Sequence, residues 1–338
     1  MTLPETMEAL VVRNYGDWRD AAIEQVPVPQ PGAGEVLIRS GGAALNFPDL
    51  LMIEGGYQVK PTLPFVPGRD IAGEVVALGQ WVEGVSIGDR VAAQPPFGAF
   101  AEYAAVPAHT CVPLPDGVSF ANAAATGTVI ATVVAAIKLR LDLQPGETVL
   151  VTGAAGGVGS MALQYARLLG ATPIALVSSD EKVAAALRLG AGAVVRSDRI
   201  GDPVRGLRAG LDAAGIGQVD AVIDMVGGVV AEGALRSLKP GGRFAIVGFA
   251  GGAIQQIPAN YVLLKDLVVY GSSLDRLFRT RDAALLDALD QAFAALADGR
   301  LKAEIDRTLP LSSFAEGAAR IAGREAIGKI LFRIGERT

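Results

Sequence analysis

The stretch VLVTGAAGGVGSMALQYARLLGA, residues 149–171, decides the fold class of this chain. Its apolar start predicts a buried strand, a glycine-rich turn follows, and a helix over Val158–Leu169 begins at once. In the pattern G-x-G-x-x-G, Ala154 takes the first glycine position, Gly156 the second and Gly159 the third. The second glycine lets the backbone approach a pyrophosphate, and the third lets the helix pack on the strand. We therefore expect a dinucleotide site rather than a plain structural turn, with phosphate contacts from Ala155, Gly156, Gly157, Val158 and Gly159.

Strands and helices alternate on the C-terminal side of this turn. Strands are expected at 147–152, 173–177, 193–196, 219–225, 243–248 and 267–271, and helices at 158–169, 180–189 and 230–238. The strands are apolar on both faces, as in VLVTG and FAIVGFA, which is typical of parallel strands covered by helices on either side. This part of the chain therefore predicts an α/β domain with a doubly wound parallel sheet.

The first hundred or so residues have a different pattern, with short strands separated by glycine and proline. Examples are Glu8–Val12, Glu35–Ser40, Ile71–Leu78 and Gly88–Ala93, which together predict an irregular β-barrel or sandwich. An apolar helix is expected over Thr128–Leu139 and an amphipathic helix over Asp282–Leu296. The final apolar strand, Lys329–Ile334, has no place in the parallel sheet, so we expect it to return to the N-terminal domain. We predict two domains, one from residues 1–123 and 272–338 and the other from residues 124–271.

The composition limits the possible functions. The formal net charge of −5 offers no basic surface for nucleic acid, and the most apolar segments, such as Thr128–Ile137, are far shorter than a membrane span. The single cysteine, Cys111, fits a reducing compartment, and the N-terminal residues show no signal-peptide pattern. We expect a cytoplasmic protein that binds neither nucleic acid nor membrane.

The residues about twenty positions after the glycine turn favour NADPH over NADH. An NAD site has an acidic residue there, which accepts hydrogen bonds from the ribose hydroxyl groups. This chain has Ser178 and Ser179, whose hydroxyl groups can donate to a 2′-phosphate, and Lys182 and Arg196 are expected nearby. The alternative is that Ser179 only caps a helix and Lys182 is solvated. With the register shifted by one residue, Asp180 or Glu181 would be an NAD carboxylate.

The whole chain resembles the medium-chain dehydrogenase/reductase superfamily, and within it the zinc-free NADPH:quinone oxidoreductase branch, which includes the zeta-crystallin-like proteins. The motifs that carry the resemblance are ALNFPDLLMIEGGYQ (44–58), LPFVPGRDIAGEVVALG (63–79), GDRVAA (88–93), LQPGETVLVTGAAGGVG (143–159) and IGKILF (327–332). The resemblance implies a GroES-like β-barrel catalytic domain, a Rossmann domain and a homodimer that pairs the last Rossmann strand near 267–271. It also implies that Thr132 lies beside the nicotinamide. Val226, Gly248 and Phe249 complete the expected cofactor set, the last two at the nicotinamide end.

No zinc is expected. Zinc-dependent relatives keep a metal ligand where this chain has Asn46, and a His-Glu pair where it has Arg69-Asp70. A catalytic zinc needs three protein ligands, and the chain has one histidine, His109, and one cysteine, Cys111. These two residues could face the same side of a strand, but a plain strand pair is the favoured interpretation.

Three side chains are candidates to stabilise the negative charge that hydride transfer places on a substrate oxygen. They are Asn46, with a neutral amide donor, Tyr57, which could donate a hydrogen bond or a proton, and Arg69, a cation. Each has a structural alternative. Asn46 would satisfy loop carbonyls, Tyr57 would be a lid residue, and Arg69 would pair with Asp70 or Asp49.

We therefore predict an NADPH-dependent oxidoreductase, of the NADPH:quinone oxidoreductase or alkenal/enone reductase type, whose substrate is a quinone or a small α,β-unsaturated carbonyl. A second hypothesis is an enoyl-CoA or acryloyl-CoA reductase, for which only Arg69, Arg276, Arg279 and Arg281 are placed to bind the phosphates. A third hypothesis, of a different class, is a non-catalytic NADPH-binding protein of the zeta-crystallin kind.

Overall fold

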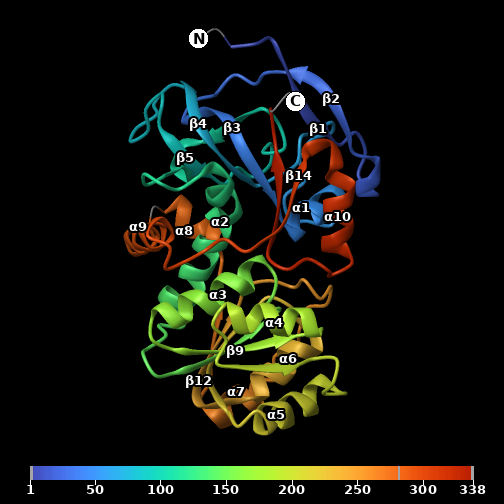
Figure 1. The fold of residues 1–338 in the computed structure, drawn as a ribbon, viewed down its shortest axis with the longest axis vertical. Coiled ribbons are helices and arrows are strands. Elements are labelled where there is room, and N and C mark those ends of the chain that lie inside the picture. Colours follow the sequence, from blue (N-terminus) through green and yellow to red (C-terminus); the bar gives the residue numbers. More distant parts are fainter. Residues whose placement is uncertain (1–2, 281, 336–338) are drawn as a thin grey trace. The chain divides into compact units, whose positions relative to one another are not determined.

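The computed structural model describes residues 3–280 and 282–335, which form two compact units (Figure 1). The first unit contains the residues up to Thr128 and those from Ala303 onward, and the second contains Val129–Lys302. The expected domains placed residues 272–302 with the N-terminal part, whereas the structure places them in the second unit. The reason is hydrophobic, since helix α9 (Ala283–Ala297) packs its buried face on the helical segment η3 (Val134–Arg140).

A mixed sheet with the strand order β14-β15-β3-β4-β5-β7 organises the first unit, and β6 pairs with β3. The strands are β3 (Glu35–Leu45), β4 (Asp70–Leu78), β5 (Arg90–Ala93), β6 (Tyr103–Pro107), β7 (Val112–Pro113), β14 (Ile305–Pro310) and β15 (Lys329–Arg333). Strand β15 is antiparallel to β3, with Ile330 opposite Leu45. In Figure 1 this red strand accordingly runs beside the blue β3. The prediction that the last strand returns to the N-terminal domain is confirmed.

A hairpin and two helices complete the first unit. The hairpin strands β1 (Thr6–Val11) and β2 (Ala22–Pro27) are antiparallel. The helices are α1 (Phe47–Ile53) and α10 (Phe314–Ala322), and short 3₁₀ turns lie at Trp18–Asp20, Ala108–Thr110 and Leu311–Ser313. Both helices share one apolar core with β15, in which Leu50, Phe314 and Phe332 are almost fully buried. This core fixes α1 against the sheet, because a seven-residue helix is not stable alone.

The second unit is a parallel sheet with the strand order β10-β9-β8-β11-β12-β13. Its strands are β8 (Thr148–Thr152), β9 (Thr172–Val177), β10 (Ala193–Arg196), β11 (Val219–Asp224), β12 (Leu238–Ile246) and β13 (Val268–Gly271). Its helices include α3 (Gly157–Leu168), α4 (Asp180–Arg188), α5 (Pro203–Ala213), α6 (Gly228–Arg236), α7 (Ala259–Lys265) and α8 (Leu274–Arg279). This strand order is that of a doubly wound dinucleotide-binding sheet, so the expected fold class is confirmed.

The apolar helix near residue 130 is longer than expected. It begins as α2 (Phe120–Val133) and continues as the π-helical segment η3. Within the described residues, Phe120–Arg140 is the one helix whose length and composition would allow it to cross a membrane. Most of its length is buried inside the protein, as in a core helix.

Among the described residues, sequence patterns missed five α-helices, namely α1, α5, α7, α8 and α10. Helix α1 is short and contains Pro48 in its first turn, which suits a helix start but reads as a loop signal in isolation. Helix α5 contains two glycines, and α7 follows Pro258 and has no buried residue to set a clear apolar period. Strand β12 also begins earlier than expected, since its residues from Leu238 contain a Pro-Gly-Gly sequence that predicts a turn.

Candidate functional site

The glycine turn joins β8 to α3 as the sequence predicts, and the structure shows why glycine is needed. Gly153, one residue before the expected motif, has a φ of 60° and makes the tight turn. At Gly159 an added Cβ would lie 2.3 Å from the carbonyl oxygen of Gly153 and 2.6 Å from the Cα of Ala154, so helix and turn pack too closely for any side chain. Gly156 is the N-cap residue of α3, where no side chain caps the helix. The first N–H groups of α3 are therefore available to an anion.

The residues expected to bind a 2′-phosphate gather at the start of α4. Ser179 is its N-cap residue, and its Oγ accepts a hydrogen bond from the Lys182 backbone N–H at 3.3 Å. The Lys182 ammonium donates to Ser178 Oγ at 3.4 Å, so these two side chains face the same point. Ser178 and Lys182 therefore form the polar pair that the sequence predicts, while Ser179 also serves the capping role that was its alternative.

Arg196 ends β10 in an acidic environment that the sequence analysis did not foresee. Its guanidinium donates from Nε and Nη2 to the two oxygens of Asp198, at 2.8 and 2.6 Å, and from Nη1 to Asp180. Hydrogen bonds from Arg196 hold the pKa of the Asp198 carboxyl below its usual range. The carboxylates of Asp180 and Asp198 thus share the guanidinium of Arg196, which was expected to bind the 2′-phosphate of the cofactor. These pairs engage three of the five N–H donors of Arg196, so a phosphate bound there would share the cation with two carboxylates.

A buried carboxylate organises the loops at the carboxyl end of the second sheet. Asp224 accepts a hydrogen bond from Thr152 Oγ1 at 2.6 Å and from the backbone N–H groups of Val226 and Gly227 at 3.2 and 3.0 Å. The loop after β12, which carries Gly248 and Phe249, bonds to the loop after β11 through Gly248 N and Gly251 N. The expected residues Val226, Gly248 and Phe249 therefore lie together, at the edge where ligands bind in such sheets. Thr132 lies on α2, half-buried.

In the first unit, Tyr57 and Arg69 form a direct pair. Arg69 Nη1 donates a hydrogen bond to the Tyr57 hydroxyl oxygen at 2.7 Å, and both side chains are half-buried. Tyr57 is held by the turn that ends α1, since its backbone N–H donates to the carbonyl of Leu51. Gly68, with a φ of 101°, packs against the ring of Phe100 and so orients Arg69. Since a guanidinium has no acceptor, the Tyr57 proton points away from Arg69.

Asn46 is the third predicted catalytic residue, and its side-chain amide is engaged by the protein itself. Its Nδ2 donates to Asp70 Oδ2 at 2.9 Å and, more weakly, to the Ala44 carbonyl at 3.4 Å. Its Oδ1 accepts a hydrogen bond from Lys329 Nζ at 2.6 Å. Asp70 also accepts hydrogen bonds from the backbone N–H and the hydroxyl of Thr128. Both amide hydrogens of Asn46 thus have acceptors in the protein, which leaves no strong donor for a substrate oxygen.

Asp49 is joined to the Asn46–Asp70–Lys329 network through Asn46 and is fully buried. Its Oδ2 accepts the backbone N–H of Asn46 at 2.8 Å, which caps α1, whereas within the described part of the chain its Oδ1 has no hydrogen-bond partner. The pKa of the Asp49 carboxyl is raised to about 7, chiefly by burial and also by the nearby charge of Asp70, while the Asn46 N–H, Lys329 and Arg69 act in the opposite direction. The carboxyl therefore exchanges its proton near neutral pH.

The residues at the zinc positions of metal-dependent relatives do not fit a metal. Asn46 and Asp70 are tied to a lysine ammonium, and Arg69 carries a positive charge. His109 is exposed on a 3₁₀ turn rather than on a strand, and burial raises the pKa of the Cys111 thiol to about 12, which opposes the thiolate form that binds zinc. Among the described residues no three His, Cys, Asp or Glu side chains gather to hold an ion.

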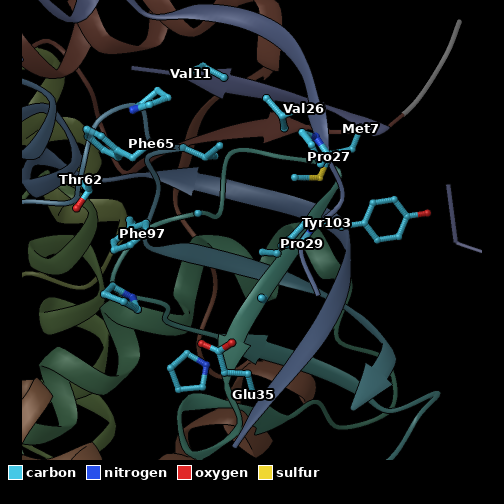
Figure 2. Close-up of a pocket in the computed structure, with 17 residues that line it drawn as sticks. Met7, Val11, Val26, Pro27, Pro29, Glu35, Thr62, Phe65, Phe97 and Tyr103 are labelled. Atoms are coloured by element: carbon cyan, nitrogen blue, oxygen red, sulfur yellow. The ribbon is translucent and has the colours of Figure 1, made fainter. Parts of the chain in front are cut away.

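A surface hollow of about 570 Å³ also lies in the first unit. Figure 2 shows that Val11, Val26 and Pro27 of the β1–β2 hairpin line it together with Phe65 and Phe97. Neither Asn46 nor Tyr57 nor Arg69 lines this hollow. Its wall is mainly apolar, with Glu35, Thr62 and Tyr103 as the polar side chains among the residues that line it, and we do not assign it to the chemistry.

Sequence reasoning missed four members of the buried network, namely Asp49, Asp70, Thr128 and Lys329, as site residues. The two aspartates were considered only as partners of Arg69, yet Asp70 is held by Thr128, Asn46 and Lys329. The available signal was Lys329 itself. A lysine directly before the apolar run Ile330–Phe332 is rarely buried unless it is paired.

The comparisons with known proteins agree with this geometry. Residues 32–116 match the alcohol dehydrogenase GroES-like domain family, and residues 157–291 match the zinc-binding dehydrogenase family. The chain is 35% identical to quinone oxidoreductase-like protein 2 of Bos taurus, over 94% of this chain and 90% of that protein. It is 30% identical to the acryloyl-coenzyme A reductase of Sulfurisphaera tokodaii, over 97% of this chain and 100% of that protein.

Solved structures show the same likeness. The mycobacterial protein Rv1454c, solved in complex with NADPH, superposes with a TM-score of 0.88 at 28% identity and covers 97% of this chain and 99% of its own. Both units of the fold, the glycine turn and the residues at the former zinc positions are thus consistent with one assignment. The chain belongs to the medium-chain dehydrogenase/reductase superfamily, in its zinc-free quinone oxidoreductase-like branch.

Proposed function

We propose that this oxidoreductase uses NADPH to reduce a quinone or a small α,β-unsaturated carbonyl. The observation that carries the proposal is the Tyr57–Arg69 pair, in which a cation donates to the phenol oxygen and leaves the phenol proton free to donate elsewhere. A hydrogen-bond donor of this kind suits a reaction that develops negative charge on a substrate oxygen. The relationship to quinone oxidoreductase-like proteins supports the same chemistry.

The second unit has the residues to hold the cofactor. The uncapped start of α3 and the bare backbone of Gly156 suit a pyrophosphate, and Ser178 with Lys182 suits a 2′-phosphate. The Val226, Gly248 and Phe249 loops would enclose the nicotinamide. When bound, the reduced nicotinamide supplies a hydride.

The first unit supplies the polar groups for the acceptor. Tyr57 donates its hydroxyl hydrogen to the acceptor oxygen, and Arg69 stabilises the phenol oxygen as that hydrogen is shared. Asn46 is part of the supporting structure rather than a direct donor, because its amide is bonded to Asp70 and Lys329. No metal-dependent step is needed for this arrangement.

The test is to follow the oxidation of NADPH and NADH by absorbance against quinones, enals, enones and short enoyl-CoA thioesters. With an accepted substrate, Tyr57→Phe should lower kcat by roughly two to three powers of ten while the Kd for NADPH stays unchanged. Tyr103→Phe is the matched control, because this half-buried tyrosine lies on β6 and lines the apolar hollow. If Tyr57→Phe turns over as fast as the control, the donor assignment is wrong. Absence of turnover with every acceptor would favour a non-catalytic NADPH-binding protein.

An acyl-CoA thioester is the second candidate acceptor, because acryloyl-coenzyme A reductases are among the relatives. Of the arginines expected to bind its phosphates, Arg276 and Arg279 are exposed on α8, and Arg281 lies outside the described residues. An acyl-CoA reductase should prefer an enoyl-CoA over the same enoyl group on pantetheine, and Arg276→Ala should reduce that preference. Equal kcat/KM for both thioesters would exclude recognition of the CoA phosphates.

We also propose that the protein is a cytoplasmic homodimer that pairs the outer edges of two second-unit sheets. Strand β13 ends the order of that sheet, and its Val268 is 42% exposed. Leu263 and Leu264 on the preceding helix are each 80% exposed. An apolar strand edge of this kind is normally covered in solution.

A further inference from the structure

We propose that Lys329 is a positioning residue of the reductase site, which fixes the Asn46 side chain and, through it, helix α1 and the turn after it that holds Tyr57. The inference rests on the proposed function, because Tyr57 is the group proposed to contact the acceptor. Lys329 begins the final strand and is separated from Asn46 by most of the chain. Neither the sequence patterns nor the family matches assign it a role.

The placement of Lys329 follows from the strand register. Strand β15 is antiparallel to β3, with Ile330 opposite Leu45, so Lys329 stands beside the residue that follows Leu45, which is Asn46. The ammonium donates to Asn46 Oδ1 at 2.6 Å and to Asp70 Oδ2 at 3.2 Å. Its side chain is only 7% exposed, and that of Asp70 is 1% exposed. A lysine is buried to this degree only when its charge is paired.

The chemistry of the two partners fixes the amide of Asn46 in one orientation. A lysine ammonium can only donate hydrogen bonds, and a carboxylate can only accept them. Asn46 must therefore turn Oδ1 toward Lys329 and Nδ2 toward Asp70, as the structure has it. A flipped amide would place a donor against the ammonium and an acceptor against the carboxylate. With Lys329 removed, only one of these two constraints remains.

Asn46 is connected to Tyr57 through a single short helix. The Asn46 backbone N–H is bound by Asp49 at the start of α1, and the backbone N–H of Tyr57 is bound by Leu51 at its end. A helix of seven residues has little stability of its own, so its position depends on its caps and its packing. A shift of Asn46 therefore moves the turn that holds Tyr57.

The experiment compares Lys329→Met with the double variant Lys329→Met/Asp70→Asn. Removing the lysine alone leaves the Asp70 carboxylate buried without its cation, so the variant should lose thermal stability. The double variant replaces both charges and should recover stability. It should not recover kcat, because two neighbouring amides no longer fix the orientation of Asn46. We expect kcat to be lower on the order of a hundredfold in both variants, with an unchanged Kd for NADPH.

The matched control is Lys239→Met in the second unit, where Lys239 Nζ pairs with Asp220 at 2.7 Å outside the proposed site. This variant should keep kcat. If the double variant recovers both kcat and stability, Lys329 only neutralises the buried charge of Asp70, and the proposal is overturned. So would an unchanged kcat in Lys329→Met.

Hydrogen–deuterium exchange tests the positioning role of Lys329 independently of the proposed reaction. Backbone amides of residues 47–57 should exchange faster in both Lys329 variants than in the wild type, and at the wild-type rate in Lys239→Met. This readout needs no substrate, so it tests the positioning of α1 even if no acceptor is turned over. Unchanged exchange over residues 47–57 in Lys329→Met would refute the positioning role, whereas faster exchange without any wild-type turnover would refute only the proposed reaction.

Discussion

Replacing Asp49 by asparagine should change how the stability of the first unit depends on pH. Burial raises the pKa of this fully buried carboxyl to about 7 in the folded protein. An aspartate in an unfolded chain has a pKa of about 3.9. Between these values the folded state holds a proton that the unfolded state has lost, so the free energy of unfolding falls as the pH rises.

The size of the effect follows from the shift in pKa. A difference of about three pKa units corresponds to roughly 4 kcal/mol, at about 1.4 kcal/mol for each unit. The wild type should therefore lose up to roughly 4 kcal/mol of stability from this group between about pH 4 and about pH 7. In the Asp49→Asn variant the amide oxygen would still accept the hydrogen bond from the Asn46 N–H, but the side chain has no proton to exchange in this range. The variant should show a correspondingly flatter dependence.

Urea denaturation followed by tryptophan fluorescence is a suitable assay. Both tryptophans of the chain, Trp18 and Trp81, lie in the first unit, so the signal reports the unit that contains Asp49. Trp18 is buried in the same apolar cluster as Leu50 of α1 and should dominate the change, whereas Trp81 is 83% exposed.

Asp116→Asn is the control, since this carboxyl is exposed in the same unit. Parallel pH dependences of the wild type and Asp49→Asn would show that Asp49 holds no extra proton in the folded state, and would refute the reasoning.

Three further predictions concern the second unit. Gly159→Ala should weaken NADPH binding more than about tenfold, because the added Cβ would lie 2.3 Å from the Gly153 carbonyl oxygen. Equilibrium titration followed by NADPH fluorescence measures the Kd. An unchanged Kd would contradict the packing argument. Lys182→Ala should raise the Kd for NADPH about tenfold and leave the Kd for NADH unchanged. An equal effect on the two Kd values would place the 2′-phosphate elsewhere than at Ser178 and Lys182. Val268→Asp should convert the proposed dimer to a monomer in light scattering, since it places a charge on the sheet edge, and a persistent dimer would exclude that interface.

Much of the second unit could be predicted from local patterns. The turn at residues 153–159, the strand before it, the helix after it and the strand at 193–196 depend on glycine placement and on short apolar runs, which are visible in the sequence. Such features are local, because a tight turn next to a helix start needs the same residues wherever it occurs. Residues 272–302 were misplaced because their attachment depends on packing against η3, a contact between distant segments.

The candidate site was predictable in its residues but not in their partners. Tyr57 and Arg69 were both candidates, yet their hydrogen bond joins side chains from two loops and had no sequence signal. Arg196 was expected to attract a phosphate. Asp198 pairs with it from two residues along the chain, whereas the ion pair with Asp180 forms only when β10 and α4 are in place.

Local sequence thus sets the type of each element and the chemistry that the chain can offer, because backbone freedom and apolar periodicity act over a few residues. The assignment of each polar group to its partner depends on strand register. Lys329 reaches Asn46 and Asp70 only because β15 pairs with β3, and that pairing is decided by the shared apolar core of Phe332 and its neighbours rather than by any property of residues 327–332 alone. Hydrophobic burial therefore selects the arrangement, and the buried charges find their partners within it.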